Sequence, residues 1–183
     1  DAPFKSAFVE FLSSWNILRQ KVDSTSVLFA VGEIVKVEAM HKATDMYGPL
    51  PYLKFGLTNP VPYDSQQAIY ESFFKELDHA IDILVKFDQA NPSSKALVKF
   101  DLIFNSNIPN WIRFANSLKL RLAMRISAVY EDAQKIAEAA VAHPYGVIES
   151  NDNNPTMQSN SNLSFTYNNP IHSISSCLLY TSP

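Results

Sequence analysis

Glycine and cysteine are scarce in this chain, and their scarcity excludes several kinds of site. Only 4 of the 183 residues are glycine, and none forms the glycine-rich loop that cradles a phosphate. The single cysteine, Cys177, excludes an intrachain disulfide bond. No nucleophile-elbow or zinc-protease motif occurs, and the four histidines stand apart. These absences predict a protein that is not an enzyme and that has no metal and no organic cofactor.

Concentrated positive charge and long apolar runs are also lacking. The formal net charge is −3, and the 15 lysines and arginines are scattered along the chain. A nucleic-acid backbone needs a concentrated basic surface, so we expect no nucleic-acid partner. No apolar run approaches the roughly 20 residues that a membrane-spanning helix requires.

Apolar residues recur at the spacing of an α-helix through most of the chain. Asp64, followed three residues later by Gln67, is the expected N-cap of the strongest helix. No clear strand pattern appears, so we predict an all-α fold with long loops. The predicted helices span residues 4–20, 27–44, 64–86, 110–129 and a shorter stretch from 131.

The composition changes near residue 150. Residues 150–170 are rich in Asn, Ser and Pro, which is typical of an extended loop. The last residues show neither a helix cap nor an apolar stripe, and we expect residues 173–183 to be a truncated or foreign tail. We therefore divide the chain into a helical region, residues 1–149, and a loop and tail, residues 150–183.

A proline-rich segment joins the second and third predicted helices. Residues 44–52 read T-D-M-Y-G-P-L-P-Y. Gly48 can take a positive φ without steric cost, and the two prolines that follow it exclude a helix. We expect a rigid corner that carries the aromatic rings of Tyr47 and Tyr52.

Four motifs, in this order, resemble the SusD/RagB family of nutrient-binding outer-membrane lipoproteins. The corner is similar to the family's T-D-x-Y-G-D-x-P-Y, with Pro49 in place of the usual Asp. The similarity extends from about residue 4 to residue 172, where Asn169-Pro170 matches a later element. The three other motifs are V-P-Y-D-S-Q-Q-A-I-Y at 61–70, E-L-D-H-A-I at 76–81 and W-I-R-F-A-N-S-L-K-L-R-L-A-M-R-I at 111–126.

The resemblance implies an all-α fold of tetratricopeptide-like helix pairs with irregular loops on one side. Family members are anchored by a lipidated N-terminal cysteine on the cell surface of the outer membrane. They capture oligosaccharides, or peptides in some branches, and deliver them to a SusC-type TonB-dependent transporter. Members are several times longer than this chain. We therefore expect an internal fragment from the N-terminal half, with the lipid anchor outside it.

Four aromatic residues are candidates for ligand contact: Tyr47, Tyr52, Phe55 and Trp111. Sugar C–H faces dock on aromatic rings, as apolar ligand faces do in concave sites. In the alternative interpretation, Tyr47 and Tyr52 pack the corner onto neighbouring helices and Trp111 anchors the start of its helix.

Two arginines, Arg121 and Arg125, lie one turn apart on a predicted helix. A half-buried arginine needs a carboxylate, so we expect ion pairs with Glu38, Asp45 or Asp78. An arginine clamp for an anionic ligand is the alternative. The residues that we assign to structural motifs are Asp45, Gly48, Pro51, Arg121 and Arg125.

Other functions remain open from the sequence. A helical-repeat scaffold without a small-molecule ligand predicts an apolar groove along stacked helices. A helical glycoside-processing enzyme needs two carboxylates that face each other across a cleft. Glu38, His41 and Asp45 share a helix face, which fits either a metal site or a polar stripe that pins a loop.

Overall fold

The computed structural model describes residues 2–156 of the chain. No strand occurs within this range, and one isolated antiparallel bridge joins Leu50 to Asp64. The predicted tail, Asn169-Pro170 and Cys177 lie outside the described residues, so the proposed division near residue 149 stays a prediction. The elements are α1 (Ala2–Lys5), η1 (Ser6–Leu12), α2 (Ser13–Lys21), α3 (Val27–Tyr47), α4 (Gln66–Ala90), α5 (Ile108–Arg125), α6 (Ala133–Val141) and η2 (Asn151–Asn153).

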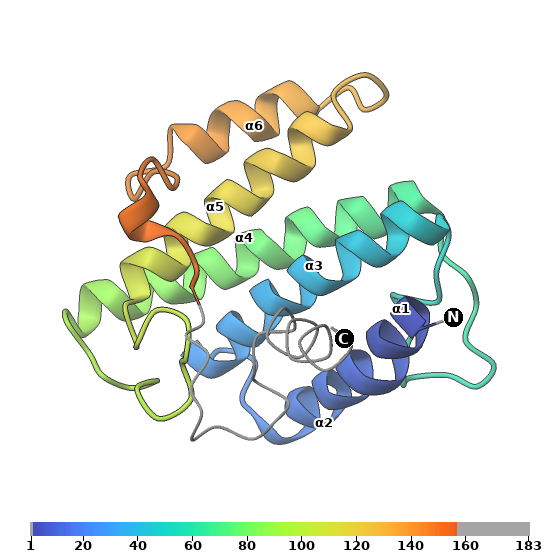
Figure 1. The fold of residues 1–183 in the computed structure, drawn as a ribbon, viewed down its shortest axis with the longest axis horizontal. Helices are drawn as coiled ribbons and strands as arrows, with labels where there is room; N and C mark the ends of the chain where they lie inside the picture. The colour runs from blue at the N-terminus through green and yellow to red at the C-terminus, as the bar shows by residue number, and fades with distance from the viewer. Residues whose placement is uncertain (1, 157–183) are drawn as a thin grey trace, which may run out of the picture.

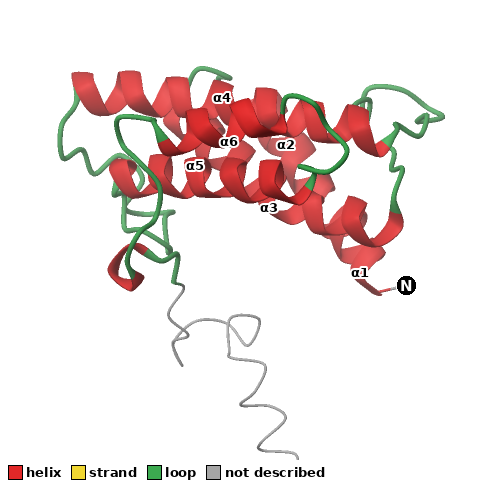
Figure 2. Cartoon of the chain, turned by 90° about the horizontal axis from the view of Figure 1, so that it is seen from above, coloured by secondary structure: helices red, strands yellow, loops and turns green. Residues whose placement is uncertain are grey.

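Consecutive long helices run antiparallel and pack as pairs (Figure 1). The helix α3 lies against α4, α4 lies against α5, and α5 lies against α6. The N-terminal helices pack on α3, and loops join the helix ends (Figure 2). Within the described residues the predicted all-α fold of tetratricopeptide-like helix pairs with long loops is confirmed.

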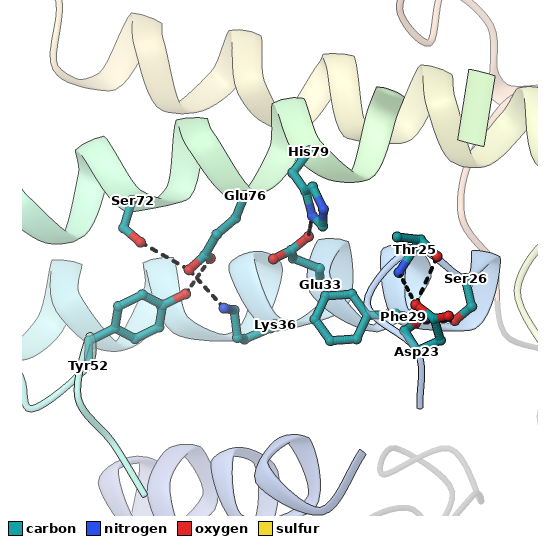
Figure 3. Close-up of polar contacts among 10 residues, drawn as sticks. All are labelled: Asp23, Thr25, Ser26, Phe29, Glu33, Lys36, Tyr52, Ser72, Glu76 and His79. Atoms are coloured by element: carbon teal, nitrogen blue, oxygen red, sulfur yellow. Dashed lines mark hydrogen bonds and ion pairs between the residues drawn. The ribbon is translucent and has the colours of Figure 1, made fainter. Parts of the chain in front are cut away.

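The N-terminal segment forms a continuous helix whose middle part, Ser6–Leu12, is π-helical. The apolar spacing predicted the helix but not the wider π turn. Ser26 then caps α3, because its Oγ accepts a hydrogen bond from the Phe29 N–H at 3.2 Å (Figure 3).

The core lies between the helix pairs and is continuous from the N-terminal segment to α6. Each large apolar side chain that leaves water contributes about 1.5–3 kcal/mol, so burial supplies what the β-branched residues of α3 lose in helix propensity. The largest fully buried side chains are Trp111, Phe73, Leu12, Ile34, Met40, Leu50, Ile69, Leu77, Leu84, Ile112, Leu118 and Leu122.

The corner after α3 folds back onto the start of α4. Gly48, at φ 73°, ends α3, and its N–H donates to the Thr44 carbonyl at 2.7 Å. Pro51 is the centre of a tight turn in which the Tyr52 N–H donates to the Leu50 carbonyl at 3.0 Å. The backbone bridge from Leu50 to Asp64 then closes the loop.

The predicted N-cap of α4 is wrong by one residue. Ser65 is the cap, and its Oγ accepts from the Ala68 N–H at 3.2 Å. The carboxylate of Asp64 instead accepts from the N–H groups of Tyr52 at 3.0 Å and Leu53 at 2.7 Å. It is therefore used to hold the corner, which a local capping pattern cannot reveal.

Two helix ends also differ from prediction. The helix α4 continues to Ala90, beyond the predicted end at residue 86. The helix α5 ends at Arg125 rather than at residue 129, because the Ile126 N–H turns to the Ala123 carbonyl in a tighter bond. Val129, the last residue of the predicted helix, is consequently 86% exposed.

The loop between α4 and α5 is built around Asp101. Its carboxylate accepts from the N–H groups of Ile103 at 3.0 Å, Phe104 at 2.9 Å and Ser106 at 2.8 Å. The same carboxylate accepts from the indole N–H of Trp111 at 2.8 Å. One buried acid thus satisfies the loop backbone and fixes it to the first turn of α5.

Gly48→Ala should lower the free energy of unfolding by about 1–3 kcal/mol. The cause is backbone strain at φ 73° and ψ −127°, since no described atom lies within 4 Å of the added Cβ. Urea unfolding measures the effect. Met46→Ala, at a side chain that is 63% exposed, should stay within about 0.5 kcal/mol of the wild type. Equal stability of the two variants would contradict the role of Gly48.

Candidate functional site

The carboxylate of Glu76, on α4, joins three parts of the fold (Figure 3). Its Oε1 lies 2.8 Å from the ammonium of Lys36 on α3 and accepts from the Ser72 hydroxyl at 3.0 Å. Its Oε2 accepts from the Tyr52 hydroxyl at 2.6 Å. Burial and the neighbouring carboxylate raise the pKa of Tyr52 well above its usual value, so this phenol stays protonated and donates.

Lys36 extends this cluster to the N-terminal helix. Its ammonium lies 4.7 Å from the centre of the Trp15 ring and 5.2 Å from that of Tyr52. Such cation–π contacts stabilise a charge that is removed from water. The Lys36–Glu76 pair, whose side chains are 8% and 16% exposed, thus has several partners within the fold, which an ion pair removed from water requires.

A second polar pair lies beside the first on the same helix interface. Glu33 Oε2 lies 2.7 Å from His79 Nδ1. Burial raises the pKa of Glu33, while the bond to His79 acts in the opposite direction. The contacts of Glu33 with His79 and of Glu76 with Lys36 thus both join α3 to α4.

Three ion pairs connect α5 to α3 and α4. Arg121 and Arg125 are about half exposed, at 51% and 55%, so each pair contributes about 0–1 kcal/mol. The guanidinium groups lie against carboxylates, which agrees with the interpretation that these arginines form structural ion pairs. The pairs are Lys119 with Asp78, Arg121 with Glu38, and Arg125 with Asp45, the last at 2.9 Å.

Two of the four candidate aromatic residues are buried. Tyr52 is 6% exposed and bonds Glu76, and Trp111 is 1% exposed and bonds Asp101. Neither ring presents a face to solvent. Their positions favour the alternative interpretation, in which these rings pack the corner and the start of α5.

The other two candidates are half-buried near the N-terminal helix. The Tyr47 ring meets the Phe4 ring edge-on at 5.6 Å, and its hydroxyl has no hydrogen-bond partner among the described residues. The Phe55 ring lies 6.0 Å from that of Phe8. The structure therefore does not bring the four candidates together on one surface, and their role in ligand contact stays a prediction.

A cavity of about 460 Å³ lies where the first turns of α4 meet the end of α5. This volume is within the range of small-molecule sites. Asp45 fixes one wall, because its Oδ1 accepts from the Tyr70 hydroxyl at 2.6 Å and its Oδ2 forms an ion pair with Arg125, 2.9 Å from Nε. Burial and the bond to Asp45 raise the pKa of Tyr70. The Phe74 ring adds an apolar surface.

Polar groups line the remaining wall of this cavity. The side-chain amide of Gln66 donates to the Thr44 carbonyl at 2.9 Å, and that of Gln67 donates to Glu71 Oε1 at 3.0 Å. Tyr130, in the turn after α5, also lines the cavity. Slight burial and the nearby carboxylate of Glu71 raise the pKa of Tyr130. The cavity therefore combines aromatic rings with hydrogen-bonding groups.

Sequence reasoning missed most of this cavity. It assigned Asp45 and Arg125 to structural motifs, with a metal site and a clamp for an anionic ligand as the respective alternatives. The spacing of Gln67, Glu71 and Phe74 along the first turns of α4 could have indicated a shared side of the helix. No spacing pattern indicated Tyr130, because the helix was predicted to continue to residue 129, where the structure has a turn.

Neither a metal site nor a membrane-spanning helix is found in the described part of the chain. Across residues 2–156, no group of three or more His, Cys, Asp or Glu side chains is arranged to hold a metal ion. None of the helices described there has the length and apolarity needed to cross a membrane.

A comparison with protein-family models gives one match, which covers residues 1–178. The matching model is SusD-like, described as SusD and RagB outer membrane lipoprotein. This chain belongs to the SusD/RagB family. The resemblance seen in its sequence motifs is thereby confirmed. The comparison with curated proteins found no match.

Solved SusD structures share the fold of this chain. A chitin-binding SusD homologue from Flavobacterium johnsoniae is 34% identical, with a TM-score of 0.85 over 96% of this chain and 36% of that one. A chitin-binding protein is 40% identical, with a TM-score of 0.71 over 86% and 34%. A SusD homologue from Bacteroides vulgatus is 35% identical, with a TM-score of 0.76 over 88% and 32%. The chain thus spans about a third of the length of these relatives.

Lys36→Met should lower the free energy of unfolding by about 3 kcal/mol, because it leaves Glu76 buried without its cation. The double variant Lys36→Met/Glu76→Gln should recover most of this loss, since the amide oxygen can still accept from Tyr52. Urea unfolding of the wild type, the two single variants and the double variant gives the coupling.

Lys75→Met on the exposed side of α4 is the matched control and should change stability by less than about 0.5 kcal/mol. If Lys36→Met were as stable as this control, the Lys36–Glu76 pair would have no structural role.

Proposed function

We propose that the protein containing this chain binds oligosaccharides at the outer surface of the outer membrane and delivers them to a SusC-type TonB-dependent transporter. The observation that carries this proposal is the match to a chitin-binding SusD homologue over 96% of the chain at a TM-score of 0.85. A lipid anchor outside this chain would hold the protein at the membrane, in keeping with the family's description as outer membrane lipoproteins.

The described residues support binding rather than catalysis. The buried carboxylates of Glu33 and Glu76 are engaged by His79, Lys36 and Tyr52. The cavity between α4 and α5 offers rings and hydrogen-bonding groups, which suit a sugar. Since two relatives are described as chitin-binding, chito-oligosaccharides are the first ligands to test. Peptides are the alternative ligand class.

The second candidate function, a scaffold that binds proteins, is favoured by one surface. On the loop between α4 and α5, Val98, Phe100 and Leu102 are 45%, 70% and 50% exposed. The Asp101 hydrogen bonds hold this loop in place. A rigid apolar loop of this kind suits contact with another protein, such as the transporter.

Titration calorimetry of the 183-residue chain against oligosaccharides of N-acetylglucosamine and glucose, and against a peptide panel, tests the ligand. We expect binding of at least one oligosaccharide with a Kd below about 1 mM, which corresponds to about −4 kcal/mol. If the folded chain bound no member of either class, the proposed function would be wrong for this part of the protein.

A pulldown with the SusC-type transporter from the same genome, with and without the sugar, separates the two candidates. The nutrient-delivery function predicts that the chain binds both the transporter and the sugar. Transporter binding without any sugar binding would favour the scaffold.

A further inference from the structure

We infer that the cavity between α4 and α5 is a subsite for neutral or amine-bearing sugars and that it rejects acidic ones. This inference rests on the proposed function, because it names the part of the chain that would contact the saccharide. It depends on three features of the cavity: its aromatic surfaces, the direction of its hydrogen bonds and its charge.

The aromatic surface open to a ligand is the half-buried ring of Tyr130, in the turn after α5. The rings of Tyr70 and Phe74 on α4 also line the cavity, but they are only 4% and 6% exposed and add little to this surface. A pyranose ring presents C–H groups on its faces, and these pack on aromatic rings. The cavity of about 460 Å³ has room for such a ring and its substituents.

The wall of the cavity offers hydrogen-bond acceptors to a ligand. One of the two side-chain N–H groups of Gln66 donates to the Thr44 carbonyl, and one of those of Gln67 donates to Glu71. Their amide oxygens and the second carboxylate oxygen of Glu71 make no other hydrogen bond among the described residues. Sugar hydroxyls and amines can donate to such oxygens, whereas an ionised carboxylate can only accept.

The charge of the wall also disfavours an acidic sugar. Two carboxylates, Asp45 and Glu71, and one guanidinium, Arg125, line the cavity. Arg125 is already paired with Asp45 at 2.9 Å. Glu71 therefore remains as the uncompensated charge, and it disfavours an acidic ligand through like-charge repulsion.

Contacts within the chain hold the walls of the cavity in place without a ligand. Asp45 holds Tyr70 through a hydrogen bond to one carboxylate oxygen and Arg125 through an ion pair with the other, and Gln66 bonds the start of α4 to the end of α3. Asp45 is thus a positioning residue rather than a ligand contact. A preformed wall lowers the entropy lost on binding.

Calorimetric titration of the 183-residue chain with three disaccharides tests the inference: N,N′-diacetylchitobiose, its doubly deacetylated diamine and digalacturonate. We expect the two chitobiose forms to bind at least tenfold more tightly than digalacturonate. Equal or tighter binding of digalacturonate would overturn the selectivity.

Two variants then locate the site. Tyr130→Ala should weaken diacetylchitobiose about tenfold, and Glu71→Lys should weaken the diamine by at least tenfold while improving digalacturonate. Leu57→Ala and Glu10→Lys are the controls, at exposed positions that do not line the cavity, and should leave all three affinities within twofold. Thermal unfolding checks that each variant is folded. If Tyr130→Ala did not fold, the charge reversal at Glu71 alone would decide.

The possible failures are distinguishable. If the wild type bound diacetylchitobiose but both cavity variants bound like their controls, the saccharide would lie elsewhere and only this inference would fail. If the folded wild type bound none of the three disaccharides and no oligosaccharide of the wider panel, the proposed function would fail as well.

Discussion

The carboxylate of Glu76 determines how the central helices meet. It is bonded at once by Lys36 from α3, by Tyr52 from the corner and by Ser72 from its own helix. A carboxylate and an ammonium in the interior are tolerated only in a geometry that satisfies both, so the register of α3 against α4 and the path of the corner are fixed together. Apolar burial drives the helices together, and this cluster selects one arrangement.

The remaining polar contacts extend that arrangement toward the cavity. Once the corner is fixed, Asp64 binds the backbone of Tyr52 and Leu53 and so sets the point where α4 begins. Asp45, at the end of α3, then reaches both Tyr70 on α4 and Arg125 on α5. Three acids, Glu76, Asp64 and Asp45, thus lead from the core to the cavity wall. This rigid construction suits the proposed role of the protein in ligand recognition by shape and hydrogen bonding.

Much of the fold could be predicted from local patterns in the sequence. Periodic apolar residues located the helices, and Gly48 with its following prolines located the corner, because both signals depend on neighbouring residues. The errors arose where distant residues compete. Asp64 has the sequence pattern of an N-cap, yet its carboxylate accepts hydrogen bonds from the backbone of the corner. The cavity was missed because Glu71 and Tyr130 meet only through the packing of α4 on α5. Motif resemblance supplied the family, which periodicity alone could not.

Hydrogen exchange of backbone amides in wild type and Glu76→Gln tests most directly whether this carboxylate unites the segments. We predict that amides of α3, of α4 and of the corner, including the Tyr52 and Leu53 N–H groups, lose protection together in the variant. Loss of protection confined to the α4 turns around residue 76, with α3 and the corner unchanged, would contradict the claim.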